Sequence, residues 1–262
     1  MSGFIYFGLL PIHNYSAIVA RYKSHHYDFM TYQRNSIRGA TIGFVGVGLM
    51  GSPMVERLLD LKYEVRVLAN NSRKNIANDL KEIGVGYVDA PLGRTPLFAR
   101  EGKLNIMGAG QKNDFNSIKP ILDDLGENVF YIGPSGSGHS LKLINNFIAM
   151  TTASSMSQAF AVGDLAKIPR KTLYEILAAG PLHSGMMDFI KEQAINGDIK
   201  LEFAVKNGLK DVSYFVDMIN DLGFQSHISS GTKDTLASAN ADGWGDKMVP
   251  ELVDYFSKSS DK

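Results

Sequence analysis

The spacing of apolar and polar residues changes several times along the chain. Residues 41–45 form a short apolar run rich in β-branched side chains, which predicts a buried strand. Apolar residues then recur at helical spacing from Met54 to Leu61, and residues 64–68 read as a second strand. One further helical stretch, residues 72–83, precedes a third strand over residues 86–90. This order of strand, helix and strand predicts an α/β domain.

A glycine-rich turn joins the first predicted strand to the helix. It reads Gly46-Val47-Gly48-Leu49-Met50-Gly51, a G-x-G-x-x-G between a strand and a helix. In such a turn the glycines allow a tight bend, close approach of the backbone to a pyrophosphate, and close packing of helix on strand. The helix amino terminus offers unpaired N–H groups to the phosphates. The motif predicts that Gly46, Gly48, Leu49, Met50 and Gly51 contact a dinucleotide.

The end of the second predicted strand does not decide which dinucleotide binds. An acidic residue there would hydrogen-bond the ribose hydroxyls of NAD, but this chain has Asn70 and Asn71, followed by Arg73. Asn70 is the candidate for a ribose hydroxyl, and Arg73 could approach a 2′-phosphate. Both NAD and NADP therefore remain open as the cofactor.

A second glycine-rich turn, beginning at Gly136, opens a later helix. Lys142 and Asn146 are four residues apart and share one face of that helix. A partly buried lysine, whose pKa falls towards neutrality, is a suitable general acid or base. A neighbouring amide can hold a substrate hydroxyl without adding charge. The alternative, a solvated lysine beside a capping asparagine, is the commoner situation.

Two further stretches carry candidate binding groups. Gly93-Arg94-Thr95 follows a predicted strand, and an arginine with a hydroxyl on such a loop could hold an anionic substrate group. The alternative is an ordinary surface turn. Lys210-Asp211 lies in a helical stretch, where its simplest interpretation is a solvated charge pair.

Composition excludes several classes of protein. The 262 residues carry 27 Lys and Arg against 27 Asp and Glu, so the balance does not favour nucleic acid as a partner. The chain has no cysteine, which excludes disulfides, Cys-ligated metals and a thiol nucleophile. No apolar run approaches the roughly 20 residues of a membrane helix, so no membrane association is expected. The histidines lack metal-ligand spacing, and no metal site is predicted.

The first forty residues differ from the rest in composition. They hold many tyrosines and histidines but a single acid, Asp28, and they show weak periodicity. They are expected to be a poorly ordered extension or an overlong start, with Met30 as the alternative first residue. Neither a secretory nor a mitochondrial signal is well matched, and cytoplasm is the expected location, with mitochondria as the alternative.

Taken together, these motifs resemble the β-hydroxyacid dehydrogenase family, which includes the 3-hydroxyisobutyrate dehydrogenases. The resemblance covers residues 41–257 and rests on four stretches that occur in the family's order: residues 43–54, residues 89–93, Gly102-Lys103-Leu104, and the helix start from Gly136 to Asn146. Lys210-Asp211 also matches a later Lys-Asp-Leu element, with Val212 in place of leucine.

The resemblance implies a Rossmann-like domain over residues 41–139 and an all-helical domain over residues 140–262, after the extension of residues 1–40. It implies that Lys142 is the catalytic acid or base, that Asn146 binds substrate, and that Lys210 approaches the nicotinamide end of the cofactor. The long connecting helix would span residues 140–168. Further helices are expected near residues 171–178, 184–196, 203–222, 230–240 and 247–257.

The implied reaction is hydride transfer between NAD or NADP and a short 3-hydroxy acid. The substrate loop departs from the common Ser-Gly-Gly pattern, because Gly93, Arg94 and Thr95 stand there. This loop is similar to that of sulfolactaldehyde reductases, in which the arginine would hold an anionic headgroup. A small hydroxy acid is thus the expected ligand. Apolar helix faces lead us to expect a homodimer or homotetramer.

One departure concerns the length of the predicted nucleotide domain. A Rossmann sheet needs two βαβαβ halves, and each βαβ unit takes about 30 residues. The stretch from Gly51 to Asp89 has room for little more than one strand–helix pair. On the order of 60 residues of the family's domain are missing, which would leave the first strand with an open edge. The alternative function is therefore an inactive or truncated relative that keeps the helical oligomerisation domain.

Overall fold

A computed structural model describes residues 4–7, 17–21, 41–45, 50–68 and 86–259. Contacts divide the chain into two compact units, residues 1–142 and residues 143–262, and each unit is described by itself. Within the described part of the chain, no helix combines the length and the apolar character needed to cross a bilayer.

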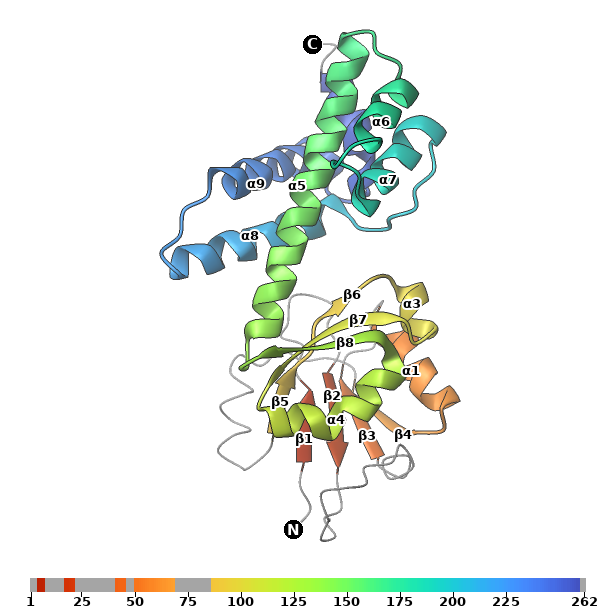
Figure 1. Ribbon diagram of the computed structural model, residues 1–262, viewed down its shortest axis with the longest axis vertical. Coiled ribbons are helices and arrows are strands. Elements are labelled where there is room, and N and C mark those ends of the chain that lie inside the picture. The colour runs from red at the N-terminus through yellow and green to blue at the C-terminus, as the bar shows by residue number, and fades with distance from the viewer. Residues whose placement is uncertain (1–3, 8–16, 22–40, 46–49, 69–85, 260–262) are drawn as a thin grey trace. The chain divides into compact units, whose positions relative to one another are not determined.

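The first unit is a sheet with helices packed on it (Figure 1). Its strands are β1 (Phe4–Phe7), β2 (Ala17–Arg21), β3 (Thr41–Val45), β4 (Glu64–Leu68), β5 (Gly86–Asp89), β6 (Leu92–Gly93), β7 (Leu104–Gly110) and β8 (Gly126–Gly133). Its helices are α1 (Gly51–Asp60), α3 (Pro96–Arg100) and α4 (Lys112–Leu125). The predicted strands at residues 41–45 and 64–68 and the helix that follows Gly51 are confirmed.

The described strands form one sheet in the order β4-β3-β2-β1-β5-β7-β6, and β8 pairs with β7. β3 and β4 are parallel, as in the first half of a Rossmann domain, and their register joins Thr41 to Glu64 and Val45 to Leu68. β1 runs parallel to β5, whereas β2 is antiparallel to both β1 and β3.

This order overturns two expectations drawn from the sequence. Residues 4–7 and 17–21 are strands inside the sheet, so this part of residues 1–40 is not an extension outside the domain. The edge of β3 that faces away from β4 is not open either, because β2 pairs with it. Backbone hydrogen bonding to a neighbouring strand outweighed the weak periodicity of the N-terminal sequence. The helical stretch expected at residues 72–83 lies outside the described residues.

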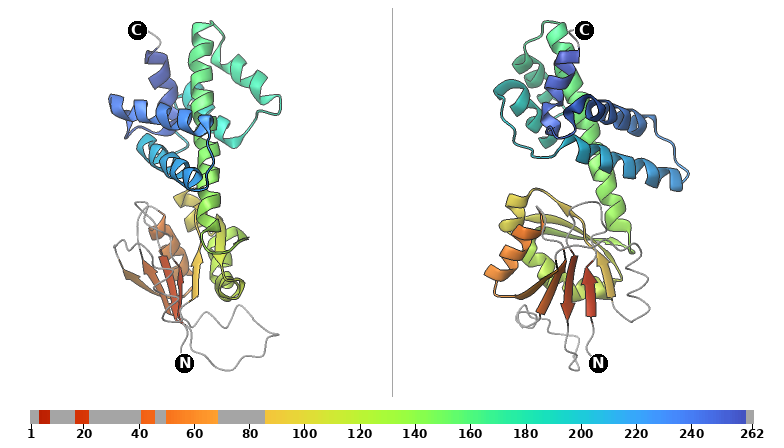
Figure 2. Two further views of the ribbon diagram at one scale, coloured as in Figure 1. Left: turned by 90° about the vertical axis from the view of Figure 1, so that its left-hand side faces the viewer. Right: turned by 180° about the vertical axis from the view of Figure 1, so that it is seen from behind.

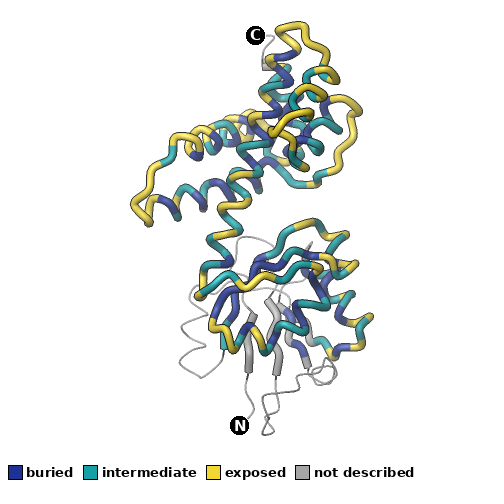
Figure 3. The backbone as a smooth tube through the Cα atoms, viewed as in Figure 1, coloured by how far each residue is buried: buried dark blue, intermediate teal, exposed yellow. Residues whose placement is uncertain are grey.

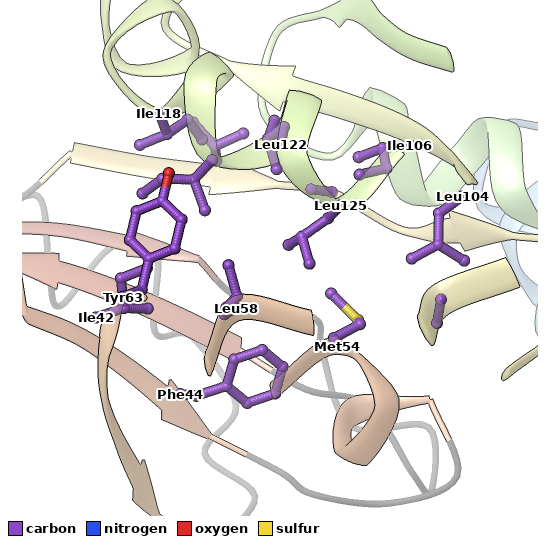
Figure 4. Close-up of a cluster of buried hydrophobic side chains, with 14 of the residues drawn as sticks. Ile42, Phe44, Met54, Leu58, Tyr63, Leu104, Ile106, Ile118, Leu122 and Leu125 are labelled. Atoms are coloured by element: carbon purple, nitrogen blue, oxygen red, sulfur yellow. The ribbon is translucent and has the colours of Figure 1, made fainter. Parts of the chain in front are cut away.

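A single apolar core holds the first unit together. Met54 and Leu58 of α1 point into the same cluster as Ile118, Leu122 and Leu125 of α4 (Figure 4). The strands contribute fully buried side chains to it, namely Ile42, Phe44, Leu104 and Ile106. The apolar periodicity of residues 54–61 is therefore the face that α1 packs into this core.

The second unit is helical (Figures 1 and 2). The long helix α5 (Ser137–Leu165) begins in the first unit and continues into the second. The remaining elements are α6 (Arg170–Ala178), α7 (Gly185–Lys191), a π-helical turn (Glu192–Asn196), α8 (Val205–Asp221), α9 (His227–Ala239), a second π-helical turn (Asn240–Trp244), a 3-10 turn (Val249–Glu251) and α10 (Leu252–Ser259). These bounds agree with the helical stretches expected from the sequence. The fold is thus a Rossmann-like domain followed by a helical domain.

Buried positions recur along α8 at helical spacing, as Figure 3 shows by colour. They include Gly208, Asp211, Val212 and Phe215. Asp211 is the exception among these small or apolar residues, because it places a carboxylate on the buried face of the helix.

Candidate functional site

The amino end of α5 is held by Asp89, the last residue of β5. The Asp89 carboxylate accepts hydrogen bonds from the backbone N–H of Gly136 at 2.7 Å and of His139 at 3.2 Å, and it contacts Nδ1 of His139 at 3.1 Å. Asp89 is fully buried. Burial alone would raise its pKa, but the hydrogen bonds from His139 and Gly136 outweigh burial, so the pKa of Asp89 lies below its usual value. A buried carboxylate therefore caps the helix that carries Lys142 and Asn146.

Two glycines make this tight helix start possible. Gly136 has a φ of +93°, a left-handed conformation that strains any other L residue. A Cβ on Gly138 would lie 2.4 Å from the carbonyl oxygen of Met107 and 2.8 Å from Oδ2 of Asp89. The glycine turn predicted to open a helix is confirmed, and its second glycine lets the first turn of α5 lie against β7.

Lys142 follows in the second turn of α5 and is partly buried. Asn146 lies one further turn along the same helix, also partly buried, so the two side chains share a face as predicted. The role of Lys142 as acid or base stays a prediction.

In the second unit, Asn146 is bound to a residue that the sequence did not single out as functional. Its Nδ2 donates a 2.7 Å hydrogen bond to Oδ2 of Asp211 in α8. Nζ of Lys210 lies 3.3 Å from the other oxygen, Oδ1, in an ion pair that lacks hydrogen-bond geometry. The interpretation of Lys210-Asp211 as a solvated charge pair is wrong for Asp211, which is only 3% exposed. Its position on the apolar face of α8 was the sequence signal for burial.

The contact between α5 and α8 around this hydrogen bond is close. A Cβ on Gly208 would lie 2.8 Å from Sδ of Met150. On the other side of Asp211, the rings of Phe147 and Phe215 stack with centroids 4.3 Å apart and an interplanar angle of 5°. These contacts hold the two helices at the spacing that the hydrogen bond from Asn146 to Asp211 requires.

The predicted substrate loop is in the first unit. Arg94 has a φ of +76°, which is unusual for a residue with a side chain. Its Nη1 donates to the carbonyl oxygen of Lys103 at 2.6 Å and pairs with Glu127 at 2.5 Å, and its guanidinium lies 5.1 Å from the centre of the Phe98 ring. A ligand anion at Arg94 would therefore share the guanidinium with Glu127.

The two neighbours of Arg94 complete this loop. Gly93 ends β6 beside Asn105, and a Cβ on Gly93 would lie 3.3 Å from Cβ of Asn105. Thr95 precedes α3 as its N-cap residue, and in the described structure its side chain makes no capping hydrogen bond. Their roles in binding substrate stay predictions.

Most of the predicted cofactor contacts lie outside the described residues, namely Gly46, Gly48, Leu49 and Asn70. Met50 and Gly51 are described, and α1 begins at Gly51, which is buried. Among the described residues, no side chain caps this helix start and no acidic residue occupies its first turn. A helix amino terminus of this kind fits a phosphate group, because its N–H groups and dipole favour negative charge. Lys210, the remaining predicted cofactor contact, lies beside Asp211 in the second unit.

Two models of protein families match most of the chain. The NAD-binding model of NADP-dependent 3-hydroxyisobutyrate dehydrogenase matches residues 136–256. The NAD-binding domain of 6-phosphogluconate dehydrogenase matches in two segments, residues 41–75 and 68–133. A match in two segments is what a domain with an internal deletion near these residues would produce. Both models describe NAD-binding domains, so the cofactor class is NAD or NADP.

Individual relatives agree with these matches. An L-threonate dehydrogenase of Haemophilus influenzae is 25% identical over 191 residues, which are 72% of this chain and 64% of that protein. A 2-(hydroxymethyl)glutarate dehydrogenase of Eubacterium barkeri is 29% identical over 143 residues, or 54% of this chain and 48% of that protein. The crystal structure of a 3-hydroxyisobutyrate dehydrogenase from Salmonella typhimurium superposes with a TM-score of 0.63 at 25% identity, covering 73% of this chain and 68% of that one.

The match to the L-threonate dehydrogenase thus spans somewhat less than two thirds of that relative's length. The ordered motifs, the capped helix that carries Lys142 and Asn146, and the two matched NAD-binding models lead to the same assignment. The chain belongs to the β-hydroxyacid dehydrogenase family.

Proposed function

We propose that this protein is an NAD(P)-dependent oxidoreductase that transfers a hydride between the cofactor and a short 3-hydroxy acid. The observation that carries the proposal is the hydrogen bond from Asn146 to the buried Asp211, one helical turn beyond Lys142. This hydrogen bond fixes the uncharged amide of Asn146 on the helix face that also carries Lys142. In the proposed reaction the lysine takes the proton of the substrate hydroxyl and the amide orients the substrate.

Lys142 is the proton carrier in this proposal. Oxidation of a secondary or primary alcohol removes a hydride from carbon and a proton from oxygen. A bound nicotinamide would supply the hydride acceptor, and the neutral Nζ of Lys142 accepts the proton. In the reverse direction, the ammonium of Lys142 returns the proton to the carbonyl oxygen as the hydride arrives at carbon.

Asn146 orients the substrate in this proposal. A side-chain amide has two N–H donors and a carbonyl acceptor. One N–H of Nδ2 donates to Oδ2 of Asp211 at 2.7 Å. The side-chain oxygen, Oδ1 of Asn146, accepts a hydrogen bond from Nδ2 of Asn145 at 3.2 Å. The second N–H is then directed by these two contacts towards a substrate hydroxyl or carboxylate oxygen.

The relatives and the surroundings of Arg94 support the proposed substrate class. Two relatives are named for threonate and for 2-(hydroxymethyl)glutarate, which are both hydroxy acids. A substrate that resembles 3-hydroxyisobutyrate carries one carboxylate, whereas one that resembles sulfolactaldehyde carries one sulfonate in its place. Because Glu127 already pairs with Arg94, we favour the carboxylate substrate over the sulfonate.

A second candidate function is an inactive or truncated relative that assembles through its helical unit. The shortened nucleotide domain favours it, since the chain matches only 64% of the L-threonate dehydrogenase. Titration of the full chain with NADH and with NADPH separates the two functions. Quenching of the single tryptophan, Trp244, reports binding, and calorimetry supplies an independent measure.

Saturable binding of either cofactor supports the enzyme. The next step is then a screen of 3-hydroxy acids for cofactor reduction, with Lys142→Ala as the inactive control. A folded chain that binds neither NADH nor NADPH at millimolar concentration would contradict the proposed oxidoreductase and support the inactive relative.

We also propose that the protein forms a homodimer or homotetramer through its helical unit. Large apolar side chains are exposed around the turn between α8 and α9, where Leu222 is 75%, Phe224 61% and Ile228 64% exposed. Exposed apolar patches commonly mark association surfaces. Light scattering on the purified chain measures the assembly, and Phe224→Ser is expected to shift it towards the monomer.

A further inference from the structure

The two N-terminal strands occupy the middle of the sheet in the first unit (Figure 1). β2 pairs with β3 over four positions, from Ala17 opposite Val45 to Ala20 opposite Ile42. β1 pairs with β2 on one side and with β5 on the other, where Phe7 lies opposite Val88. Among the described strands, the β3–β4 half of the sheet is joined to the β5–β7 half only through β1 and β2.

The strand directions show what this connection achieves. β1 is parallel to β5, β2 is antiparallel to β1, and β3 is antiparallel to β2. β3 and β5 therefore run in the same direction, and their carboxyl ends lie at the same edge of one sheet. β3 ends at Val45, which the predicted cofactor turn follows in the sequence, and Asp89, which caps α5, ends β5 at that edge.

A dinucleotide crevice also requires strands whose carboxyl ends lie at the same edge of one sheet. In open α/β sheets, ligands bind beyond the carboxyl ends of the strands, at the point where the strand order reverses. In the Rossmann strand order 3-2-1-4-5-6, a single strand, the fourth, lies between the first strand and the strand that corresponds to β5. In this chain β1 and β2 fill that position, although β2 runs in the opposite direction.

We propose that β1 and β2 take the place of the missing strand between β3 and β5 and are a positioning element of the cofactor site. They hold the end of β3, where the glycine turn begins, and the end of β5, which anchors α5, in one sheet. This inference rests on the proposed function for its cofactor, but the role of the two strands in the sheet can be tested separately.

The alternative is that β1 and β2 are a dispensable addition. An addition at the outer edge of a sheet can be removed without separating the other strands. Removal of a central pair leaves two unpaired edges, on β3 and on β5, and unpaired edges favour aggregation. β1 is in register with β5 and β2 is in register with β3, so the two strands are paired on both sides, as central strands are.

Hydrogen exchange on the unmodified full chain is the first test. Amides of β1 and β2 are expected to exchange as slowly as those of β3 and β5, because all of them belong to one cooperative ladder. Fast exchange at residues 4–7 and 17–21 beside slow exchange in β3 would overturn the proposal, whether or not any cofactor binds.

A backbone substitution in the full chain is the second test. Val19 lies opposite Tyr6 on one side and Gly43 on the other, so Val19→Pro removes a donor inside the ladder. We expect at least a tenfold loss of affinity for NADH or NADPH and faster exchange in β3, with exchange in α8 unchanged. Lys200→Pro, in an exposed stretch without helix or strand, is the proline control, and Val19→Ile is the conservative control.

The outcomes of the two tests separate this inference from the proposed function. Unchanged cofactor affinity in Val19→Pro would overturn the role of β1 and β2. If the unmodified chain binds neither cofactor but protects β1 and β2 from exchange, the sheet architecture stands and the oxidoreductase activity fails. In that case the effect of Val19→Pro is measured only by the exchange of the β3 amides. Intact protection of β3 in Val19→Pro would overturn the inference.

Discussion

Nδ2 of Asn146 in α5 donates a 2.7 Å hydrogen bond to Oδ2 of Asp211 in α8. The carboxylate is 3% exposed, so its orientation is set by the packing of the two helices. The stacked rings of Phe147 and Phe215 and the close approach of Gly208 to Met150 flank the contact. The amide that we expect to hold the substrate is therefore positioned by a buried carboxylate in another helix.

Asp211→Ala is expected to lower kcat/KM for the hydroxy acid by about 10- to 100-fold, because a hydrogen bond to a charged group contributes about 1.5–3 kcal/mol. The loss should appear mainly in KM for the acid. Asp217→Ala, which changes an exposed position of the same helix, is the control. Equal kinetics of the two variants would contradict a positioning role for Asp211.

Lys142→Ala is expected to lower kcat by about 10²- to 10⁴-fold, since a positioned general acid or base contributes that much. Cofactor binding should be unchanged, because the lysine acts on the substrate hydroxyl. Steady-state kinetics with the best hydroxy acid and calorimetry with the cofactor measure the two effects. Lys171→Ala, an exposed lysine of α6, should keep wild-type kinetics. An active Lys142→Ala enzyme would assign the proton transfer to another group.

Asp89→Asn is expected to destabilise the first unit by about 1.5–3 kcal/mol, because hydrogen bonds to a charged acceptor are lost and an amide N–H then faces backbone donors. Urea denaturation followed by circular dichroism measures the change. Asp123→Asn, in a half-exposed pair with Lys119 on α4, should have little effect. Equal stability of the two variants would mean that the capping hydrogen bonds of Asp89 contribute little.

The same carboxylate predicts a pH dependence. The pKa of Asp89 is lower in the folded chain than its ordinary value, so its contribution is present at neutral pH and is lost as the pH falls through the folded pKa. Stability should therefore decline below about pH 4 in the wild type. The decline should be shallower in Asp89→Asn. Parallel pH profiles of unfolding free energy for the two proteins would contradict this linkage.

Arg94→Gly separates the charge of the arginine from its backbone conformation. Glycine relieves the strain of a φ of +76°, which offsets the lost contacts of the side chain with Lys103 and Glu127, so stability should change little. If Arg94 contacts substrate, the ratio of kcat/KM values for sulfonate and carboxylate substrates should change about tenfold, as expected for loss of a charged hydrogen bond. Lys62→Gly, at another residue with positive φ (67°), is the matched control. An unchanged ratio of kcat/KM values would confine Arg94 to its contacts with Lys103 and Glu127.

Much of the architecture could be predicted from the sequence because it depends on local patterns. The apolar periodicity of residues 54–61 and the β-branched run of residues 41–45 became α1 and β3. The glycines at 136 and 138 predicted a turn into a helix, and the backbone there needs residues without side chains. The order of the motifs was sufficient to indicate the family.

The sequence did not reveal which residues pair across long distances. Residues 4–7 and 17–21 had weak periodicity, yet strand pairing depends on partners that are distant in the chain, and these residues joined β3 to β5. Asp211 was interpreted as a solvated charge because its sequence neighbour is a lysine. Its partner is Asn146, 65 residues away, in a helix crossing that only packing creates.

The amino-acid sequence by itself therefore determined the local elements, the cofactor class and the candidate lysine, because each depends on residue type and short spacing. The tertiary structure decided three other features: the central place of the N-terminal strands, the capping of α5 by Asp89, and the burial of Asp211. Each of these depends on hydrogen bonds between segments that are far apart in the chain, which form only when the backbone and side chains are brought together by folding.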